Sequence, residues 1–418
     1  MSLFGLALLL PLTASPDFIL NAAVRAETRG GMIPYAVGAP ASEALDLELM
    51  PQARLAVQHG DGRLSLGYGP RLFRRFINLP EAQAQAVNTD RFLVLHGLDA
   101  GYRHILSRSW SANASGTWQT GESDYGALTT AAGVASNSGD APATPTNNGS
   151  AAIVALSTLV AAVGLDGAFD STQRLSLAGR VVEIRSVGDS DFRVPRGLTI
   201  GGSAAWELAL TRVDLLRLAG SVDVVNFDAV DAQPALTFRN VTLQGGLERA
   251  LSENASLGGQ LGLLLINSDE TGTQFQPIGA LAFSFRPLQS RNVRTEANVT
   301  VGVDGFANPL LGTFQTRLNG GVGFSISVPP DWTFGLTGTL ATPIDEQAAG
   351  PASTDSLLGQ TVLSAALPIG VRLDQNFLLE FGGRFSALAP RFDDPNFRLA
   401  SINLIAYLAL TAAVESVL

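Results

Sequence analysis

Apolar and polar side chains alternate over long stretches of this 418-residue chain. From 292 to 304, Val, Thr and Ala occupy the odd positions, and Asn, Arg, Glu, Thr, Gly and Asp occupy the even ones. From 314 to 328 the even positions hold Phe, Thr, Leu, Gly, Val and Ile, and the odd ones hold Gln, Arg, Asn, Gly and Ser. Successive side chains of a strand point to opposite faces, so this period of two predicts strands with one apolar face.

The apolar runs of the chain are too short to cross a membrane as helices. Hydrophobic residues make up 46% of the chain and charged residues only 15%, so it could bury a large core or face lipid. A helix needs about 20 consecutive apolar residues to cross the hydrocarbon layer, and the longest candidates are 6–12, 151–163 and 404–414. If the chain spans a membrane, it must do so with strands.

The alternation recurs often enough to form a complete barrel wall. It predicts about 18 strands, each near the length that crosses an outer membrane. The pattern is weakest in 151–164 and 175–185, and 16 strands remain if this pair folds otherwise. The predicted strands are 18–29, 45–58, 63–72, 92–102, 109–119, 151–164, 175–185, 198–210, 216–225, 241–250, 255–265, 275–285, 292–304, 314–328, 332–340, 361–373, 377–385 and 402–410.

The connections between these strands alternate in length. Short polar turns such as 59–62 and 251–254 alternate with longer segments rich in Gly, Pro, Asn and Asp, as expected for periplasmic turns on one rim and external loops on the other. This order predicts a meander of hairpins, and an even strand count puts both termini on the periplasmic side. The long segments are 74–90, 121–150, 187–197, 228–234, 267–273, 305–310, 343–356 and 389–396, of which 121–150 is the largest. Large aromatic residues stand beside several short turns, as in an interfacial girdle: Trp110, Phe285, Trp332 and Phe377.

The first 15 residues are a candidate secretory signal peptide. An apolar run at 6–12 is followed by small residues that include Ala14 and Ser15, which is the pattern of a cleavage site. Cleavage there would leave 16–418 as a single barrel. No Arg or Lys precedes the apolar run, so an ordinary apolar strand is the alternative.

The alternating strands, unequal loops, aromatic rims and export-like start together resemble bacterial outer-membrane β-barrel proteins, particularly the porin-like class. The resemblance is carried by segments such as 293–303 and covers nearly the whole mature chain, but it matches no single family. It implies a transmembrane antiparallel up-and-down β-barrel in the outer membrane of a Gram-negative bacterium. Its expected partners are membrane lipid, periplasmic chaperones and the barrel assembly machinery, with a homo-oligomer as an alternative to a monomer. One departure is the end of the chain at Val417 and Leu418, where many members have an aromatic residue.

Charged side chains fall on the predicted inward face of many strands, and both signs occur. In a channel, opposed arginines and carboxylates would set a transverse field and bias solute selection. Alternatively, they would satisfy one another in salt-bridged layers inside a narrow or plugged lumen. The candidate lumen-lining residues are Asp46, Glu48, Arg54, Arg71, Asp99, Arg103, Glu207, Arg217, Asp223, Glu248, Arg294, Glu296, Arg317, Arg372, Glu380 and Arg384.

Little in the sequence indicates catalysis or a cofactor. The chain has no cysteine, its 27 basic residues are all arginine, and its net charge is minus 10, which disfavours nucleic acid as a partner. His59, His96 and His104 are the three histidines and form no metal-ligand spacing. A serine beside His104, such as Ser107 or Ser109, could imitate the site of a barrel hydrolase.

We therefore expect a porin-like passive channel for small solutes or ions, with no enzyme activity, no metal and no cofactor. Two alternatives stay open for an outer-membrane barrel: a structural or adhesive surface barrel without transport, and a barrel-type lipid or peptide hydrolase. A soluble all-β repeat protein is a third alternative, but soluble sheets usually hide their apolar face against a second layer.

Overall fold

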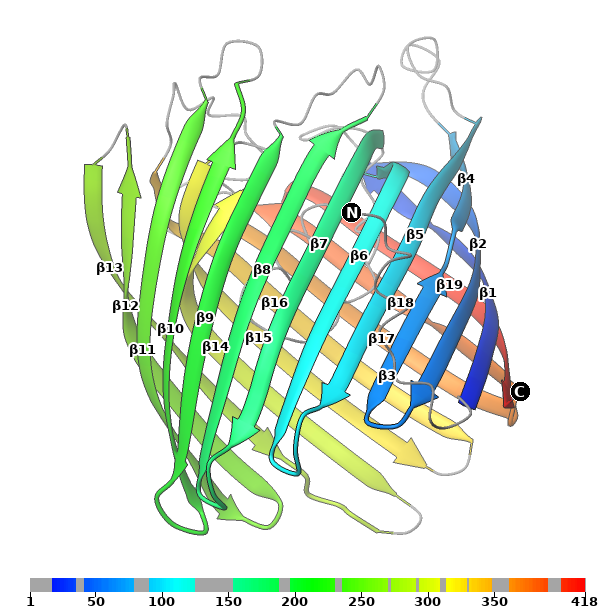
Figure 1. Ribbon diagram of the computed structural model, residues 1–418. Coiled ribbons are helices and arrows are strands. Elements are labelled where there is room, and N and C mark those ends of the chain that lie inside the picture. The colour runs from blue at the N-terminus through cyan, green and yellow to red at the C-terminus, as the bar shows by residue number, and fades with distance from the viewer. Residues whose placement is uncertain are drawn as a thin grey trace.

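The chain folds into one large antiparallel β-barrel (Figure 1). The computed structural model describes residues 17–34, 41–78, 90–124, 153–187, 196–229, 235–269, 272–290, 293–308, 313–328, 331–347, 361–389 and 400–417. Within these ranges, no helix is both long enough and apolar enough to span a membrane.

The strands are long and follow one another along the chain. Their bounds are β1 (Asp17–Pro34), β2 (Ala41–His59), β3 (Gly62–Tyr68), β4 (Arg71–Asn78), β5 (Asp90–Ile105), β6 (Trp110–Asp124), β7 (Ile153–Ala168), β8 (Gln173–Ser186), β9 (Gly197–Ala209), β10 (Asp214–Phe227), β11 (Leu236–Ser252), β12 (Ala255–Ser268), β13 (Gly272–Phe285), β14 (Arg294–Asn308), β15 (Thr313–Val328), β16 (Trp332–Gln347), β17 (Thr361–Asp374), β18 (Phe377–Ala389) and β19 (Ala400–Val417).

β3 and β4 are two halves of a single barrel strand. Both pair with β2 and with β5 in an unshifted register, and only Gly69 and Pro70 separate them. Proline lacks the N–H that a ladder needs, while the Gly69 N–H still donates to the Gly97 carbonyl at 2.9 Å. The barrel therefore has 18 strands, as the sequence predicts.

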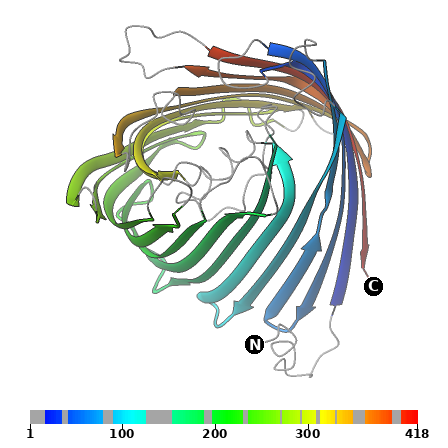
Figure 2. The ribbon, with the colours of Figure 1, turned by 90° about the horizontal axis from the view of Figure 1, so that it is seen from above.

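Each strand pairs with its neighbours in sequence, and β1 pairs with β19 to close the barrel (Figure 2). In this closing pair Ile19 lies opposite Val417. The start of β1 and the end of β19 therefore lie together on the rim of the short turns. An up-and-down closed meander leaves no free sheet edge apart from local gaps, which is what a lipid environment demands.

The strands extend further than the alternation predicts, chiefly at the rim of the long connections. Residues 74–78, 121–124, 305–308 and 343–347 belong to strands rather than to the predicted loops 74–90, 121–150, 305–310 and 343–356. Beyond the lipid both faces of a strand can be polar, so these ends carry no alternation from which a strand could be predicted. The predicted signal peptide and 125–150 lie outside the described residues.

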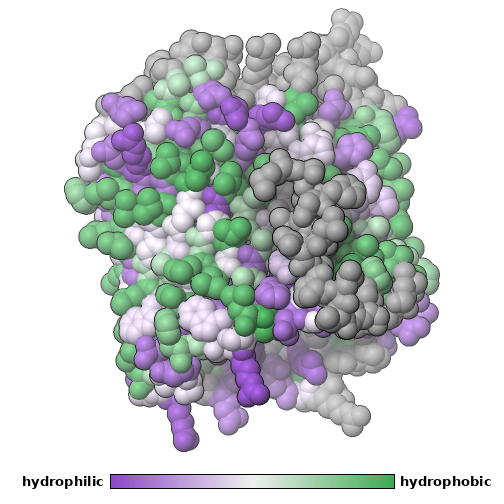
Figure 3. Space-filling model, viewed as in Figure 1, coloured by the Kyte–Doolittle hydropathy of each residue, from purple (hydrophilic) through white to green (hydrophobic). Residues whose placement is uncertain are grey.

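The outer face of the barrel is apolar. Every second residue along much of the strands exposes a hydrophobic side chain, such as Leu257, Leu261 and Leu263 on β12. Figure 3 shows apolar and neutral side chains across the middle of the face in view, with hydrophilic ones gathered toward the upper and lower rims. Phe285, Trp332 and Phe377 are exposed beside short turns, at the position of an interfacial girdle. A surface of this kind is stable in hydrocarbon and not in water.

Candidate functional site: the inner wall of the barrel

The inward face of β1 and β18 carries the centre of a network of ion pairs. Glu27 contacts three arginines: Arg25 Nη2 at 2.9 Å, Arg29 Nε at 3.4 Å and Arg384 Nη1 at 3.4 Å. Arg25 also reaches Glu380 on β18 at 3.0 Å. These charges lie on the face opposite to the exposed Leu20 and Val24 side, because they occupy the odd positions of β1.

The network continues across β2 and β4. Glu48 pairs with Arg29 and Arg71, and the Arg71 Nη2 donates to Glu48 Oε2 at 2.9 Å. Asp46 accepts two hydrogen bonds from Arg75, both at 2.9 Å, in the bidentate geometry that arginine favours. We call the whole set the charged wall; it consists of Arg25, Glu27, Arg29, Asp46, Glu48, Arg71, Arg75, Glu380 and Arg384.

The charged wall joins the strands on both sides of the barrel closure. It links β18 to β1 across the intervening β19, whose Tyr407 ring lies 4.3 Å from the Arg384 guanidinium carbon. Glu27, Arg29, Asp46, Glu48 and Arg75 are each less than 10% exposed. Charges buried to this degree need partners, because a charge that loses its partner keeps the full cost of its desolvation.

Apart from Arg317, the predicted lumen residues divide into three groups. Glu48, Arg71, Glu380 and Arg384, together with Asp46, belong to the charged wall. Further pairs on the inner face are Arg54 with Asp99 at 2.7 Å, Arg180 with Asp223 at 3.0 Å, Arg286 with Glu296 at 3.2 Å and Arg217 with Glu207 at 3.9 Å. Exposed residues with no ion pair to another described residue are Arg103, Glu248, Arg294 and Arg372. Arg317 lies on β15 opposite Asp304 of β14.

Sequence reasoning omits several members of the inner lining. Arg25, Glu27 and Arg29 follow the same period of two as the predicted lumen residues, so the signal is present in β1. Arg75 falls within the predicted loop 74–90, but it lies in β4 beside Asp46. Arg180 belongs to β8, where the alternation is weakest.

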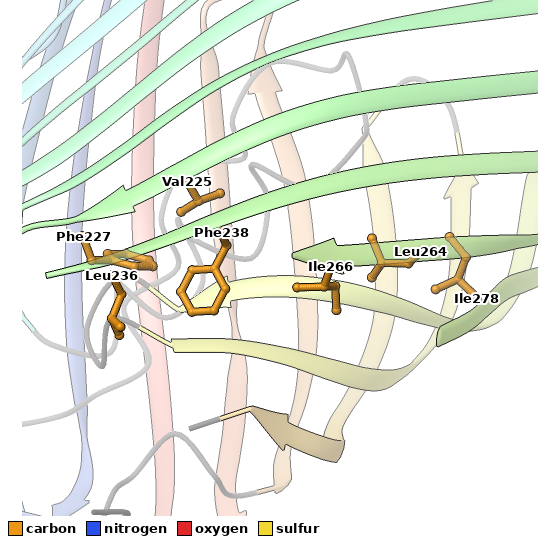
Figure 4. Packing of buried hydrophobic residues seen from close by; sticks show 7 residues of the cluster. All are labelled: Val225, Phe227, Leu236, Phe238, Leu264, Ile266 and Ile278. Carbon is orange, nitrogen blue, oxygen red and sulfur yellow. The ribbon is translucent and has the colours of Figure 1, made fainter. Parts of the chain in front are cut away.

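A second cluster on the inner face is apolar. Val225 and Phe227 of β10 meet Phe238 and Leu236 of β11, and the Phe227 and Phe238 rings form an edge contact with centroids 6.2 Å apart. These side chains point inward, because the outward positions of β10 include the exposed Val222. We call the cluster the apolar wall; its members are Val225, Phe227, Leu236, Phe238, Leu264, Ile266 and Ile278 (Figure 4).

The apolar wall corrects the expectation of a polar lining. It occupies the outer ends of β10 to β12 and the middle of β13, and all of its members are no more than 6% exposed. In the closed strand order, β11 lies half a turn from β1. The charged wall and the apolar wall therefore stand on opposite sides of the barrel, which gives the lining a polar side and an apolar side.

The histidines form no catalytic or metal-binding arrangement in the described part of the chain. His96 hydrogen bonds to the Tyr68 hydroxyl at 2.9 Å, and His104 to the Tyr102 hydroxyl at 3.3 Å. Ser107 instead accepts a hydrogen bond from the Ser109 amide at 3.3 Å. No group of three His, Cys, Asp or Glu side chains suited to a metal occurs among the described residues.

The fold matches solved bacterial outer-membrane barrels, whereas the sequence matches no family model and no curated protein. The FrpB iron transporter from Neisseria meningitidis aligns with a TM-score of 0.51 at 9% identity, over 96% of this chain and 82% of that one. OpdK, an outer membrane protein from Pseudomonas aeruginosa, aligns with a TM-score of 0.44 at 10% identity, over 96% of this chain and 99% of that one. The siderophore receptor PirA from the same organism gives 0.46 at 10% identity, over 94% and 80%.

Because the sequence identities are this low, the comparisons show a shared fold and not a shared function. The expected resemblance to outer-membrane β-barrels without a single matching family is confirmed. The apolar outer face and the fold shared with FrpB agree with the predicted outer-membrane location.

Proposed function

We propose that the chain is a porin-like passive channel for small solutes or ions. The observation that carries this proposal is the presence of charged side chains of both signs on the inner face of a closed barrel. Several of them meet solvent, as in the pair of Arg54 and Asp99, whose side chains are 57% and 38% exposed. Charges that face water inside a membrane barrel allow polar solutes to enter and select among them.

The exposed charges of the inner face support selection by charge. Besides Arg54 and Asp99, the side chains of Arg217 and Glu207 are 55% and 32% exposed, so a charged solute in the lumen would meet groups of both signs. Transport across the outer membrane also agrees with the fold shared with FrpB, which is an iron transporter. The solute that passes through the channel is expected to be small. Membrane lipid and the barrel assembly machinery are the proposed partners of the protein while it inserts into the membrane.

Conductance across a planar lipid bilayer tests the channel. Refolded protein should insert and give discrete current steps, because water and ions fill the charged interior. Protein that inserts stably but never conducts would leave a structural or adhesive barrel as the better function. That alternative draws support from the buried charged wall, which would stabilise a closed barrel whether or not solutes pass.

Ion selectivity should respond to the exposed lumen pair. Replacing Arg54 by Gln removes a positive charge and leaves Asp99 without its partner, so we expect the cation-to-anion permeability ratio to rise roughly twofold. The matched control is Arg212→Gln, because Arg212 lies in the short turn between β9 and β10. Equal reversal potentials for the two variants would contradict a conducting path past Arg54.

The hydrolase alternative is tested by replacing His96 and His104 with Ala. Turnover of phospholipid or peptide substrates that is abolished by these changes would favour an enzyme. We expect no turnover by the unmodified protein or by the variant, because both histidine rings are hydrogen bonded to tyrosines rather than to a nucleophile.

A further inference from the structure

Two arginines lie directly opposite each other on the inner face, at the rim of the short turns. In the antiparallel register Arg63 of β3 is the partner of Arg103 of β5, and both lie near the lower ends of these strands in Figure 1. Arg103 shares its face of β5 with the lumen residue Asp99, whereas Leu66 of β3 and Leu98 of β5 stand at alternate positions and are exposed on the outer face. Both arginines therefore point into the lumen.

Neither of these two arginines has a counter-ion among the described residues. Both are exposed, and no ion pair or side-chain hydrogen bond joins either of them to another described residue. In contrast, Arg54 on the same part of the wall pairs with Asp99 at 2.7 Å. Like charges that lie directly opposite each other on neighbouring strands destabilise the pair. An anion bound between the two guanidinium groups would remove that cost.

The neighbours of the two arginines in the same row carry side-chain amides. Gln58 of β2 lies opposite Arg63, and Asn113 of β6 lies opposite Arg103. Both amides are exposed. The Asn113 amide nitrogen donates to Asp166 at 2.9 Å, and this carboxylate belongs to β7, on the far side of Asn113 from Arg103. We call the four side chains the arginine row; it consists of Gln58, Arg63, Arg103 and Asn113.

The charge of the arginine row matches that of a phosphate group. Its two arginines carry two positive charges, and a phosphate group carries about 1.5 to 2 negative charges near pH 7 and has several acceptor oxygens. Each guanidinium can donate two parallel hydrogen bonds to such an oxyanion. A single carboxylate would neutralise only one of the two arginines, and chloride offers no oxygens in the geometry of the guanidinium fork.

We propose that the arginine row is a binding site for a phosphate group at the lumen mouth on the rim of the short turns. The chain as a whole has a net charge of minus 10, so a local pair of free cations is the place on this wall where an anion would concentrate. The proposal deepens the proposed channel function, on which the passage of the anion rests, by naming an anionic solute. The binding step itself needs only the folded barrel.

Equilibrium binding of radiolabelled inorganic phosphate to the refolded full chain in detergent micelles tests the site. Binding should be saturable, and Arg63→Gln and Arg103→Gln should each weaken it about tenfold, because each removes one guanidinium fork. Arg103→Lys keeps the charge and should weaken binding less than Arg103→Gln does. Arg372→Gln is the matched control, since Arg372 is an exposed arginine on the inner face of β17 that lies opposite Leu378. Equal weakening by the control, or no weakening by Arg63→Gln and Arg103→Gln, would overturn the site.

Chloride currents in a planar bilayer then show whether the bound anion lies on the conducting path. Inorganic phosphate should reduce the current of the unmodified protein, and the half-blocking concentration should be about tenfold higher in Arg63→Gln. A similar block by glycerol phosphate would extend the site to small phosphate esters, whereas block by inorganic phosphate alone would assign it to the free ion. Protein that binds phosphate but never conducts would overturn the passive channel alone. Protein that conducts but shows no saturable phosphate binding would overturn the arginine row alone.

Discussion

Glu27 is the residue on which most of the charged wall depends. Its carboxylate lies within 3.4 Å of nitrogens from Arg25, Arg29 and Arg384 and is only 4% exposed. The chain supplies every cation as arginine, whose planar fork can serve two carboxylates, as Arg25 does with Glu27 and Glu380. The pairing of these side chains across β1 and β18 depends on barrel closure, so no local sequence pattern could reveal it.

Removing the Glu27 charge should weaken the barrel. In Glu27→Gln three arginines lose their shared counter-ion in a buried setting, and we expect a loss of about 3–5 kcal/mol in the free energy of unfolding. Urea unfolding in lipid vesicles measures this loss. The control Glu248→Gln, at an exposed residue with no ion pair to another described residue, should change stability by less than about 0.5 kcal/mol. Similar losses in the two variants would show that the buried ion pairs of Glu27 stabilise the barrel no more than an exposed carboxylate does.

Asp170 provides a pH-dependent contact outside the membrane, in the turn between β7 and β8. Hydrogen bonds from the Thr172 hydroxyl and amide, both at 2.7 Å, and from the Gln173 amide at 2.8 Å lower the pKa of its carboxyl. Because the folded pKa is depressed, this contribution to the turn is present above the ordinary value of 3.8 and is lost as the pH falls through the folded pKa.

An NMR titration of the Asp170 carboxyl should therefore give a midpoint below 3.8. Thr172→Val removes the hydroxyl that is the largest cause of the shift and should raise the midpoint, whereas Thr172→Ser should keep it low. A midpoint that is unchanged by Thr172→Val would contradict the assigned cause.

At the scale of the strands, the period of two is sufficient to predict all 18 barrel strands, including the weak pair that forms β7 and β8. It fails at the outer strand ends, where both faces are polar, and at the apolar wall. Inward Phe238 and Ile266 look only like a weakening of the alternation. The short described pairing between β13 and β14 is equally hidden, because register between strands is a property of pairs.

Gly121 marks one of these outer strand ends and requires glycine. Its φ of 138° is in the region that other residues rarely adopt, and an added Cβ would collide with the Val94 carbonyl oxygen on β5. Gly121→Ala should cost about 1–3 kcal/mol in the free energy of unfolding. Gly116→Ala in the same strand is the control, since its new Cβ would meet no atom nearer than 3.8 Å. Denaturant unfolding of both variants gives the comparison, and equal stability would argue against strain at Gly121.

At the scale of the whole molecule, the interactions that hold neighbouring strands together differ around the barrel. The charged wall reinforces the closure between β1 and β19, where the two ends of the strand order must meet. About a third of a turn away, the described pairing of β13 and β14 covers only part of their length. The proposed function of this barrel depends on lipid outside it and water inside it.

That central claim is tested most directly by scanning β12 with single cysteines, one position at a time from Ser256 to Leu263, in a chain that has no other cysteine. Each variant is labelled with an environment-sensitive fluorophore in lipid vesicles. We expect labels at Leu257, Leu261 and Leu263 to be quenched by a quencher attached to lipid acyl chains, and labels at Ser256, Gly258 and Gln260 to be quenched by a water-soluble one. Quenching that shows no alternation, or that comes from water at every position, would contradict a lipid-spanning barrel with a water-filled interior.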